Sequence, residues 1–488
     1  MRVFMLGWEF PPFISGGLGT ACYGLTQGLD SVGVQVCFVL PTAKPVGGES
    51  ESPEAEACFD RTLIRESAGT QNQKIGSQPL DMPCSLNIHK LDAVLEPYSA
   101  PRTQRELDLE KIKIHARQTA AKFTRENFST RSSQAKELLR NVIANVRATK
   151  VSQVAKPKKI SGKSEPQSTM PGGSVVLGGA GVHYDGDLMS QIQRYAELAV
   201  NLALTEEFDV IHAHDWMTYA AGIAVKEATG KPLVVHVHST EFDRSGENVN
   251  QQVYDIERAG MTQADKVVCV SYLTRSIAIR RYNVLPSKIE VVYNAVDIPE
   301  LPSEMQETIA RDEKIVLFLG RITMQKGPEY FLEAARKVVD KYPKVRFVIA
   351  GSGDMTKGCI ELAADLKLGK HVTFTGFLRG NDVARVFKMA DLYVMPSVSE
   401  PFGIAPLEAM SHNVPVLISK QSGVSEVLTH ALKVDFWDVD EIANKILAVL
   451  RHDALSRTLK QHVPFELQKL SWEDSGVKLK NLYETLIK

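Results

Sequence analysis

Short apolar runs without polar alternation recur along this chain, and stretches with helical spacing separate them. Val3–Gly7, Gln35–Leu40 and Leu233–His238 are runs of this kind. A strand covered on both faces has no solvent side, so its sequence reads as a continuous apolar run. The helices between such strands supply the crossovers that parallel pairing requires. The pattern therefore predicts parallel sheets with helices on both faces, which is an α/β fold.

The pattern occurs twice along the 488 residues, which are more than one core usually holds. In the first block we expect further strands at Asp209–Asp215, Lys266–Val270 and Ile289–Tyr293. In the second block we expect strands at Ile315–Leu319, Arg346–Ala350, Val372–Phe374, Leu392–Met395 and Val414–Ile418. A charged, proline-containing segment from Asp297 to about Asp312 separates the blocks. We therefore predict two doubly wound Rossmann-like domains, residues 1–296 and 297–470, and an amphipathic helix over residues 471–488.

Composition restricts the class of function. The formal net charge is -1, which argues against a protein that coats nucleic acid. No apolar run approaches the roughly 20 residues that a membrane span needs, and Glu9 interrupts the apolar N-terminus, so we expect neither a transmembrane segment nor a signal peptide. The six cysteines form no Cys-x-x-Cys pair. Free thiols of this kind fit a reducing compartment, so we expect a cytoplasmic enzyme.

The strand pattern breaks down between about residues 44 and 181, which we interpret as a long insertion. Residues 102–165 carry about ten more basic than acidic side chains, and Lys150–Gly173 is rich in lysine, serine, proline and glycine. Such a composition is typical of a solvated, mobile segment. A second interpretation is that the basic stretch at 102–173 contacts an acceptor polymer or a membrane surface.

Two cations and two carboxylates follow predicted strands of the second block. Arg321 comes directly after the strand Ile315–Leu319 and Gly320, and Lys326 follows five residues later; Glu400 and Glu408 lie in a later loop and helix start. Ligands of α/β sheets bind outside the carboxyl ends of the strands. A nucleoside-diphosphate sugar needs fixed positive charge for its diphosphate and acceptors for its ribose and hexose hydroxyls.

A glycine-rich loop opens the first predicted helix. Gly16, Gly17, Leu18 and Gly19 follow a strand, and glycines there would let backbone N–H groups approach a phosphate at the positive end of a helix. A purely structural turn explains the same residues equally well. The loop does not follow the Gly-x-Gly-x-x-Gly dinucleotide pattern.

Two His-x-His pairs end neighbouring predicted strands, at His212 and His214 and at His236 and His238. Residues two apart in a strand point the same way, so the four imidazoles could ligate a metal, as in amidohydrolases. A metal hydrolase would leave the C-terminal block without a role, so we expect no metal site.

The spacing Arg-x4-Lys-Gly followed by Glu-x7-Glu resembles the donor site of retaining glycosyltransferases with the GT-B fold. The group 1 family is most similar, and the glycogen and starch synthases are near. The resemblance implies two domains that face a central cleft, with the C-terminal helix crossing back to the first domain. His212-Ala-His214-Asp215-Trp216 and the Gly16–Gly19 loop also resemble the glucan synthases. Ile14 and Thr20 depart from them, because those enzymes have lysine and aspartate there.

The resemblance implies a role for each matching residue. Arg321 and Lys326 would neutralise the diphosphate, Glu400 would hold hexose hydroxyls, and Glu408 would hold the ribose. The implied catalytic residues are His238, Arg321, Lys326 and Glu400, and Asp215 and Trp216 would line the acceptor and sugar pocket. The implied donor-binding residues are Gly16, Gly17, Leu18, Gly19, Arg321, Lys326, Gly351, Leu378, Glu400, Pro401, Phe402, Gly403, Ile404 and Glu408.

The function implied is retaining transfer of a hexosyl group from a nucleoside-diphosphate sugar to a carbohydrate hydroxyl. Glucose is the hexose that we expect before any other, and an α-glucan is one expected acceptor. No cofactor or metal is expected. The departures at Ile14 and Thr20 favour an alternative, a group 1 enzyme that acts on a small sugar, a sugar phosphate or a cell-envelope polysaccharide. A GT-B epimerase or a silent sugar binder is a third class.

Overall fold

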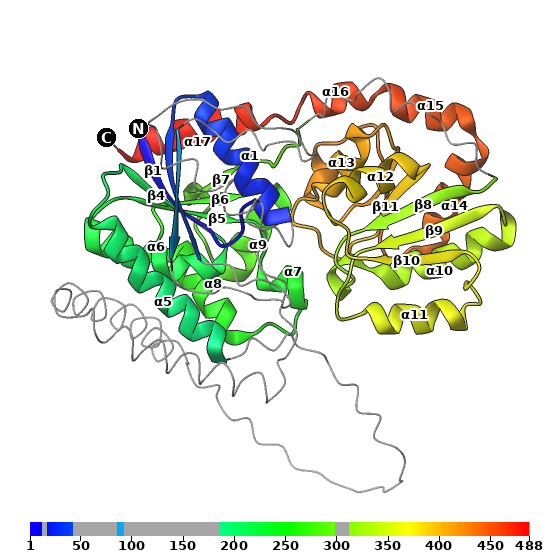
Figure 1. Cartoon of the computed structure of the whole chain (residues 1–488), viewed down its shortest axis with the longest axis horizontal. Coiled ribbons are helices and arrows are strands. Elements are labelled where there is room, and N and C mark those ends of the chain that lie inside the picture. Colours follow the sequence, from blue (N-terminus) through cyan, green and yellow to red (C-terminus); the bar gives the residue numbers. More distant parts are fainter. Residues whose placement is uncertain (12–16, 42–84, 92–185, 298–311, 488) are drawn as a thin grey trace, which may run out of the picture.

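The computed structural model describes residues 1–11, 17–41, 85–91, 186–297 and 312–487. These residues form two parallel sheets, which lie side by side in Figure 1. The first, with strand order β3-β2-β1-β4-β5-β6-β7, is the centre of what we call the N-domain. The second, with order β10-β9-β8-β11-β12-β13, is the centre of the C-domain. The α/β prediction with two doubly wound sheets is therefore confirmed.

The strands of the N-domain are β1 (Arg2–Leu6), β2 (Gln35–Pro41), β3 (Leu86–Leu91), β4 (Val210–His214), β5 (Leu233–Val237), β6 (Lys266–Cys269) and β7 (Ile289–Val291). Those of the C-domain are β8 (Lys314–Leu319), β9 (Val345–Ala350), β10 (Val372–Gly376), β11 (Leu392–Met395), β12 (Val416–Ser419) and β13 (Leu432–Val434). Chain order reverses between β1 and β4 and between β8 and β11. These two switch points are where such folds bind ligands.

Helices cover both faces of each sheet (Figure 1). In the N-domain they are α1 (Gly17–Ser31), α5 (Gly186–Ala203), α6 (Trp216–Thr229), α7 (Glu241–Ser245), α8 (Gln251–Gln263) and α9 (Tyr272–Tyr282). In the C-domain they are α10 (Pro328–Lys341), α11 (Thr356–Asp365), α12 (Asn381–Met389), α13 (Ala405–Ser411) and α14 (Val439–Arg451), and α15 (Asp453–Gln461) and α16 (Val463–Leu467) pack on α14 and α13 outside them. Within the described ranges, no helix combines the length and the apolar character needed to cross a membrane.

Two strands were not predicted. β3 lies inside the stretch interpreted as an insertion and pairs with β2 at the edge of the sheet. It alternates apolar residues with Asn87, His89 and Lys90, because an edge strand is not covered on both faces. β13 has three residues, too few for a periodic signal. The glycine- and lysine-rich segment at 150–173 and most of the expected linker lie outside the described residues.

The last helix, α17 (Trp472–Leu486), packs on α1 of the N-domain after the chain has left the C-domain (Figure 1). Glycines allow the two backbones to approach. A Cβ atom added at Gly28 would lie 1.9 Å from the carbonyl oxygen of Trp472, and one at Gly476 would lie 2.1 Å from the carbonyl oxygen of Gly28. The Lys480 Nζ also donates to the Val32 carbonyl at 2.8 Å.

Gly28→Ala should destabilise the protein because the added methyl group must push two helix backbones apart. Overpacking of this kind costs about 1–3 kcal/mol, and Gly28→Ala should show it as a lower urea midpoint. Gly358→Ala is the matched control, because Gly358 also lies in a helix but has open space around it. That control should be neutral or stabilising by about 0.5–1 kcal/mol. Equal midpoints for the two variants would contradict the close packing.

Candidate active site

A cation and a carboxylate meet at the switch point of the C-domain. Lys326 ends a short helical turn after β8, and its Nζ donates to the carboxylate of Glu400, which follows β11. The Ser397 hydroxyl donates to the same oxygen of Glu400 at 3.2 Å. Arg321 lies directly after β8 and is half-buried. The structure thus brings together residues that are 74 positions apart in the chain.

Close backbone crossings fix the loops that follow β8, β9 and β10. A Cβ atom at Gly351 would lie 1.9 Å from the carbonyl oxygen of Gly320, and Gly351 has a φ of 139°, so only glycine fits. The Gly351 N–H donates to the Gly376 carbonyl at 2.9 Å. Leu378 is half-buried in the next loop. Gly351 and Leu378 therefore lie on adjoining loops, and Gly351 packs against Gly320, the residue before Arg321.

The backbone around Glu400 is held from β12. The Glu400 N–H donates to the Gln421 carbonyl, and the Glu400 carbonyl accepts from the Gly423 N–H, both at 2.9 Å. Phe402 and Ile404 turn their side chains into the core, where they are 2% and 8% exposed. From these two residues, a donor would therefore meet mainly backbone groups.

Glu408 lies in the first turn of α13, directly after the Glu400 loop. Burial raises the pKa of its carboxyl from 4.5 to about 7. The group therefore exchanges a proton near neutral pH. Above that pH the carboxylate is ionised, and both of its oxygens can then accept hydrogen bonds from hydroxyls.

The glycine loop of the N-domain faces these residues. A Cβ atom at Gly17 would lie 4.0 Å from Cδ1 of Ile404, so the start of α1 approaches the C-domain loop that follows Glu400. Leu18 is mostly buried, and Gly16 lies outside the described residues. The Gly19 N–H donates to the carboxylate of Glu9 at 3.2 Å. One amide at this helix start is therefore bound by a protein carboxylate, which the sequence did not reveal.

Asp215 shapes the loop that carries His238. Its carboxylate accepts from the backbone N–H groups of His238 at 2.9 Å and Ser239 at 3.3 Å. Its own φ is 60°, a conformation that costs a non-glycine residue about 1–3 kcal/mol and is common at functional sites. Burial raises its pKa to about 7, although the nearby Arg244 lowers it. Asp215 thus positions a neighbouring site loop.

Trp216 lies in the core of the N-domain. The side chain is 3% exposed. As the first residue of α6 it packs inward, and its expected place in an acceptor pocket stays a prediction.

The four histidines stack at β4 and β5: His212 and His214 on β4 and His236 on β5 are buried, and His238, directly after β5, is half-buried. Nδ1 of His214 lies 2.9 Å from Nε2 of His238, and burial lowers the pKa of all four rings, so they are neutral. Two triads, Cys22 with His214 and His238 and His212 with His214 and His236, bring potential ligand atoms within 4.8 Å of one another. The rings of His212 and His236 are nevertheless stacked, 7° from parallel. A metal lies in the plane of each imidazole that binds it, so stacked rings suit a metal poorly.

Direct bonds join the two domains beside the site. The Ser399 hydroxyl donates to Asp243 of α7 at 2.6 Å, and the Ser271 hydroxyl donates to the Pro401 carbonyl at 2.6 Å. The carboxylate of Glu426 accepts from the N–H groups of Tyr272 and Leu273 at the start of α9. The Glu400 loop is thus held from both domains.

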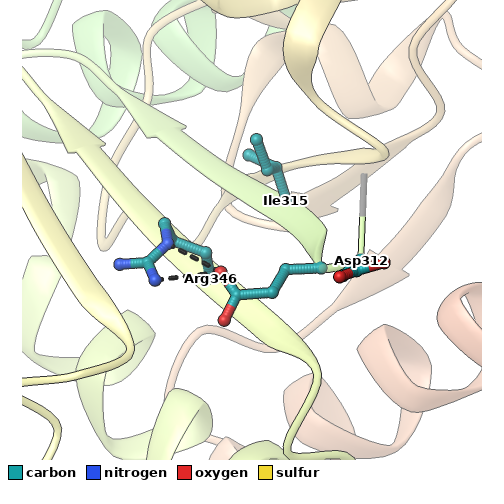
Figure 2. Close-up of a pocket in the computed structure, with 4 residues that line it drawn as sticks. Asp312, Ile315 and Arg346 are labelled. Carbon is teal, nitrogen blue, oxygen red and sulfur yellow. Dashed lines mark hydrogen bonds and ion pairs between the residues drawn. The ribbon is translucent and has the colours of Figure 1, made fainter. Parts of the chain in front are cut away.

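A cavity of about 500 Å³ lies at the opposite edge of the C-domain sheet. Asp312, Glu313, Ile315 and Arg346 line it, at the amino ends of β8 and β9, and Figure 2 shows the side chain of Arg346 paired there with a carboxylate. Ligands of parallel sheets bind at the carboxyl ends, so this cavity is not the candidate site.

Comparison with known proteins agrees with this geometry. Residues 302–463 match the family described as "Glycosyl transferases group 1", residues 174–300 match "Glycosyltransferase Family 4", and residues 2–126 match "Starch synthase catalytic domain".

Among similar proteins is an uncharacterized glycosyltransferase of Methanocaldococcus jannaschii, 32% identical over 57% of this chain and 76% of the relative. A UDP-Gal:alpha-D-GlcNAc-diphosphoundecaprenol alpha-1,3-galactosyltransferase of Escherichia coli is 27% identical over 54% of this chain and 70% of the relative. A D-inositol 3-phosphate glycosyltransferase of Mycobacterium marinum is 27% identical over 59% of this chain and 66% of the relative.

Two solved structures share the fold. Sucrose-phosphate synthase from Thermosynechococcus elongatus has a TM-score of 0.62 at 17% identity, and covers 100% of this chain and 99% of its own. Anabaena HepE, solved in complex with UDP and glucose, has a TM-score of 0.60 at 15% identity, with 100% of both chains covered. At this identity the likeness establishes the fold alone.

The raised pKa of Asp215 predicts how Asp215→Asn changes stability with pH. The folded protein holds this proton up to about pH 7, whereas the unfolded chain loses it near pH 3.8. Wild-type stability should therefore fall between these values as the pH rises, by at most about 1.4 kcal/mol per pH unit from this group. Asparagine does not titrate. The free energy of unfolding of the variant, measured by urea denaturation, should therefore rise relative to that of the wild type between pH 5 and 7. A constant difference would mean that Asp215 is not buried as described.

Proposed function

Because the chain belongs to the group 1 family of glycosyltransferases, we propose that it transfers a hexosyl group, glucose first, from a nucleoside-diphosphate sugar to a hydroxyl acceptor, with retention at the anomeric carbon. The pairing of Lys326 with Glu400 beside Arg321, at the switch point of the C-domain, carries this proposal. The start of α1 faces these residues from the N-domain, which supports a reaction in the cleft between the two domains.

The reaction divides between binding and charge stabilisation. The bond between the anomeric carbon and the diphosphate oxygen breaks, and the leaving diphosphate keeps the electron pair. Arg321 and Lys326 stabilise that charge as it develops, where fixed cations are most effective. The acceptor hydroxyl attacks the same face of the sugar and gives its proton to the leaving phosphate. Products are the nucleoside diphosphate and the new glycoside.

The remaining site residues bind and orient. Glu400 accepts hydrogen bonds from hexose hydroxyls while it holds Lys326, and Glu408 accepts them from the ribose. His238 lies beside the anomeric centre on the loop that Asp215 holds. Two protein cations serve the diphosphate, so we propose that the reaction needs neither a metal nor another cofactor.

Two acceptor classes have separate support. An α-glucan is favoured by the match of residues 2–126 to the starch synthase catalytic domain. A small sugar, a sugar phosphate or an envelope polysaccharide is favoured by the names of the relatives, one of which acts on a diphosphoundecaprenol-linked sugar and another on D-inositol 3-phosphate.

A donor screen tests the proposed function. ADP-, UDP- and GDP-glucose, with the matching galactose and N-acetylglucosamine donors, should be offered with glycogen, with inositol phosphate and without acceptor, all in EDTA. Release of nucleoside diphosphate from one donor, with incorporation into one acceptor, is expected. Absence of release from every donor, or release only after a divalent metal is added, would contradict the proposal.

Arg321→Ala should lower kcat/KM for the best donor by about 10²–10³-fold, because the lost cation acts mainly as the phosphate departs. Arg346→Ala is the matched control. That arginine pairs with Glu313 at the opposite edge of the same sheet. Because it is remote from the site, its removal should change kcat/KM by less than twofold. Equal losses in both variants would indicate general damage to the C-domain.

Donor affinity should increase with pH through the titration of Glu408. Its carboxylate binds ribose hydroxyls best when ionised, and its pKa is about 7. The diphosphate of the donor does not change charge in this range, so the donor Kd should fall between pH 6 and 7, by at most about tenfold per pH unit. Glu408→Gln should bind more weakly above pH 7 and lose the slope. If donor Kd depended on pH in the same way in Glu408→Gln and in the wild type, Glu408 would not be part of the donor site.

A further inference from the structure

Trp437 exposes 57% of its surface, whereas Trp216 and Trp472 are buried and Trp8 is half-buried. These are all four tryptophans of the chain, and the structure describes each of them. Trp437 lies in the short loop between β13 and α14. An exposed tryptophan offers a large, flat apolar surface that water solvates poorly, so a ligand that covers it gains free energy.

Two aromatic rings hold this loop in place. The ring of Phe436 packs edge-on against Trp437, with centroids 4.9 Å apart and planes at 85°. Tyr330 of α10 also packs edge-on with Phe436, with centroids 5.2 Å apart and planes at 66°. The exposed ring is therefore supported by neighbouring side chains, and a ligand that stacks on it pays little to order it.

Asp435, two residues before Trp437, gathers a charged and an amide group at this loop. Asp435 accepts from Nζ of Lys420 at 2.8 Å and from Nε2 of Gln421 at 3.2 Å. The hydrogen bond from Lys420 is the main reason that the pKa of Asp435 is lowered, so its carboxylate is ionised at neutral pH. A carboxylate has about four acceptor positions, of which these bonds use two. The cluster can therefore still accept hydroxyl protons.

Two short chains of contacts connect this surface to the donor site. On one side, the side-chain amide of Gln421 donates to Asp435, and the backbone carbonyl of Gln421 accepts from the N–H of Glu400. On the other, the ring of Tyr330 lies 3.0 Å from the position of a Cβ atom at Gly327, which follows Lys326. Lys326, Gln421 and Trp437 also follow β8, β12 and β13, whose carboxyl ends share one edge of the sheet. The tryptophan thus lies at the same edge of the sheet as Lys326 and Gln421.

We propose that Trp437, with Asp435, Lys420 and Gln421, forms a saccharide-binding subsite outside the cleft, which holds a neutral glucan segment of the acceptor or product chain. A pyranose presents axial C–H groups on one face and equatorial hydroxyls at its edge. The ring of Trp437 matches the face, and the polar trio matches the edge. This inference rests on the proposed transfer to a carbohydrate, and it favours a polymer over a small acceptor.

A protein partner fits this surface less well. Stable protein interfaces bury about 800 Å² on each side and have an apolar centre of several residues. Here the exposed Trp437 lies in a loop with Asp435 and Asp438, and Lys420 pairs with Asp435. A ligand the size of a few sugars matches both the area and the mixed chemistry.

Maltoheptaose binding, measured by calorimetry without donor, tests the subsite on the full chain. Trp437→Ala should weaken the Kd by about tenfold, the effect of losing one good aromatic contact, and Trp437→Phe should lose less. Phe465→Ala is the matched control, because Phe465 is 64% exposed on α16, and it should leave the Kd unchanged. An unchanged Kd in Trp437→Ala, or no binding of maltoheptaose to the wild type, would overturn the proposal.

Activity separates this inference from the proposed function. Trp437→Ala should raise KM for maltoheptaose while KM for maltose, which is too short to span cleft and subsite, and donor hydrolysis stay unchanged. If the wild type hydrolysed no donor, the proposed function would be contradicted. The calorimetric measurement of maltoheptaose binding would still decide whether the subsite exists. Equal increases in KM for the long and the short acceptor would overturn the subsite.

Discussion

The ion pair between Lys326 and Glu400 is the interaction on which the rest of the site depends. The carboxylate of Glu400 is 8% exposed, and a charge that is buried to this degree is costly unless a partner compensates it. Lys326 supplies that partner from the loop after β8, while Glu400 belongs to the loop after β11. The pair therefore joins the loops of the two strands that flank the switch point, and it fixes a cation at this edge of the sheet.

The same loop is held from the N-domain, so binding and domain contact are physically linked. Ser399 bonds to Asp243 and Ser271 bonds to the Pro401 carbonyl, on either side of Glu400. The contact between α17 and α1 adds a further connection between the domains, through glycines that permit almost no side chain. A change at any of these contacts is expected to alter the position of Glu400 as well as stability.

Sequence reasoning succeeded where a local signal existed. The run before Gly320 is buried and apolar, so it predicted β8 and placed Arg321 and Lys326 at its carboxyl end. It missed β3 because Asn87, His89 and Lys90 interrupt an edge strand. A local motif also does not show which way a side chain points. Trp216 follows a motif of histidines and an aspartate, yet its side chain packs inward from the start of α6. The bond from Gly19 to Glu9 and the exposure of Trp437 are set by tertiary structure and leave no local signal.

Binding of a nucleoside diphosphate in EDTA tests the central claim most directly, because it needs neither the acceptor nor turnover. Calorimetry should be done on the wild type and on Lys326→Met, which keeps the length of the side chain and removes its charge. The account predicts metal-free binding of at least one of ADP, UDP and GDP, weakened by about tenfold or more in the variant, the effect of losing a charge-assisted hydrogen bond. An unchanged Kd in Lys326→Met, or binding that appears only when a divalent metal is added, would contradict it.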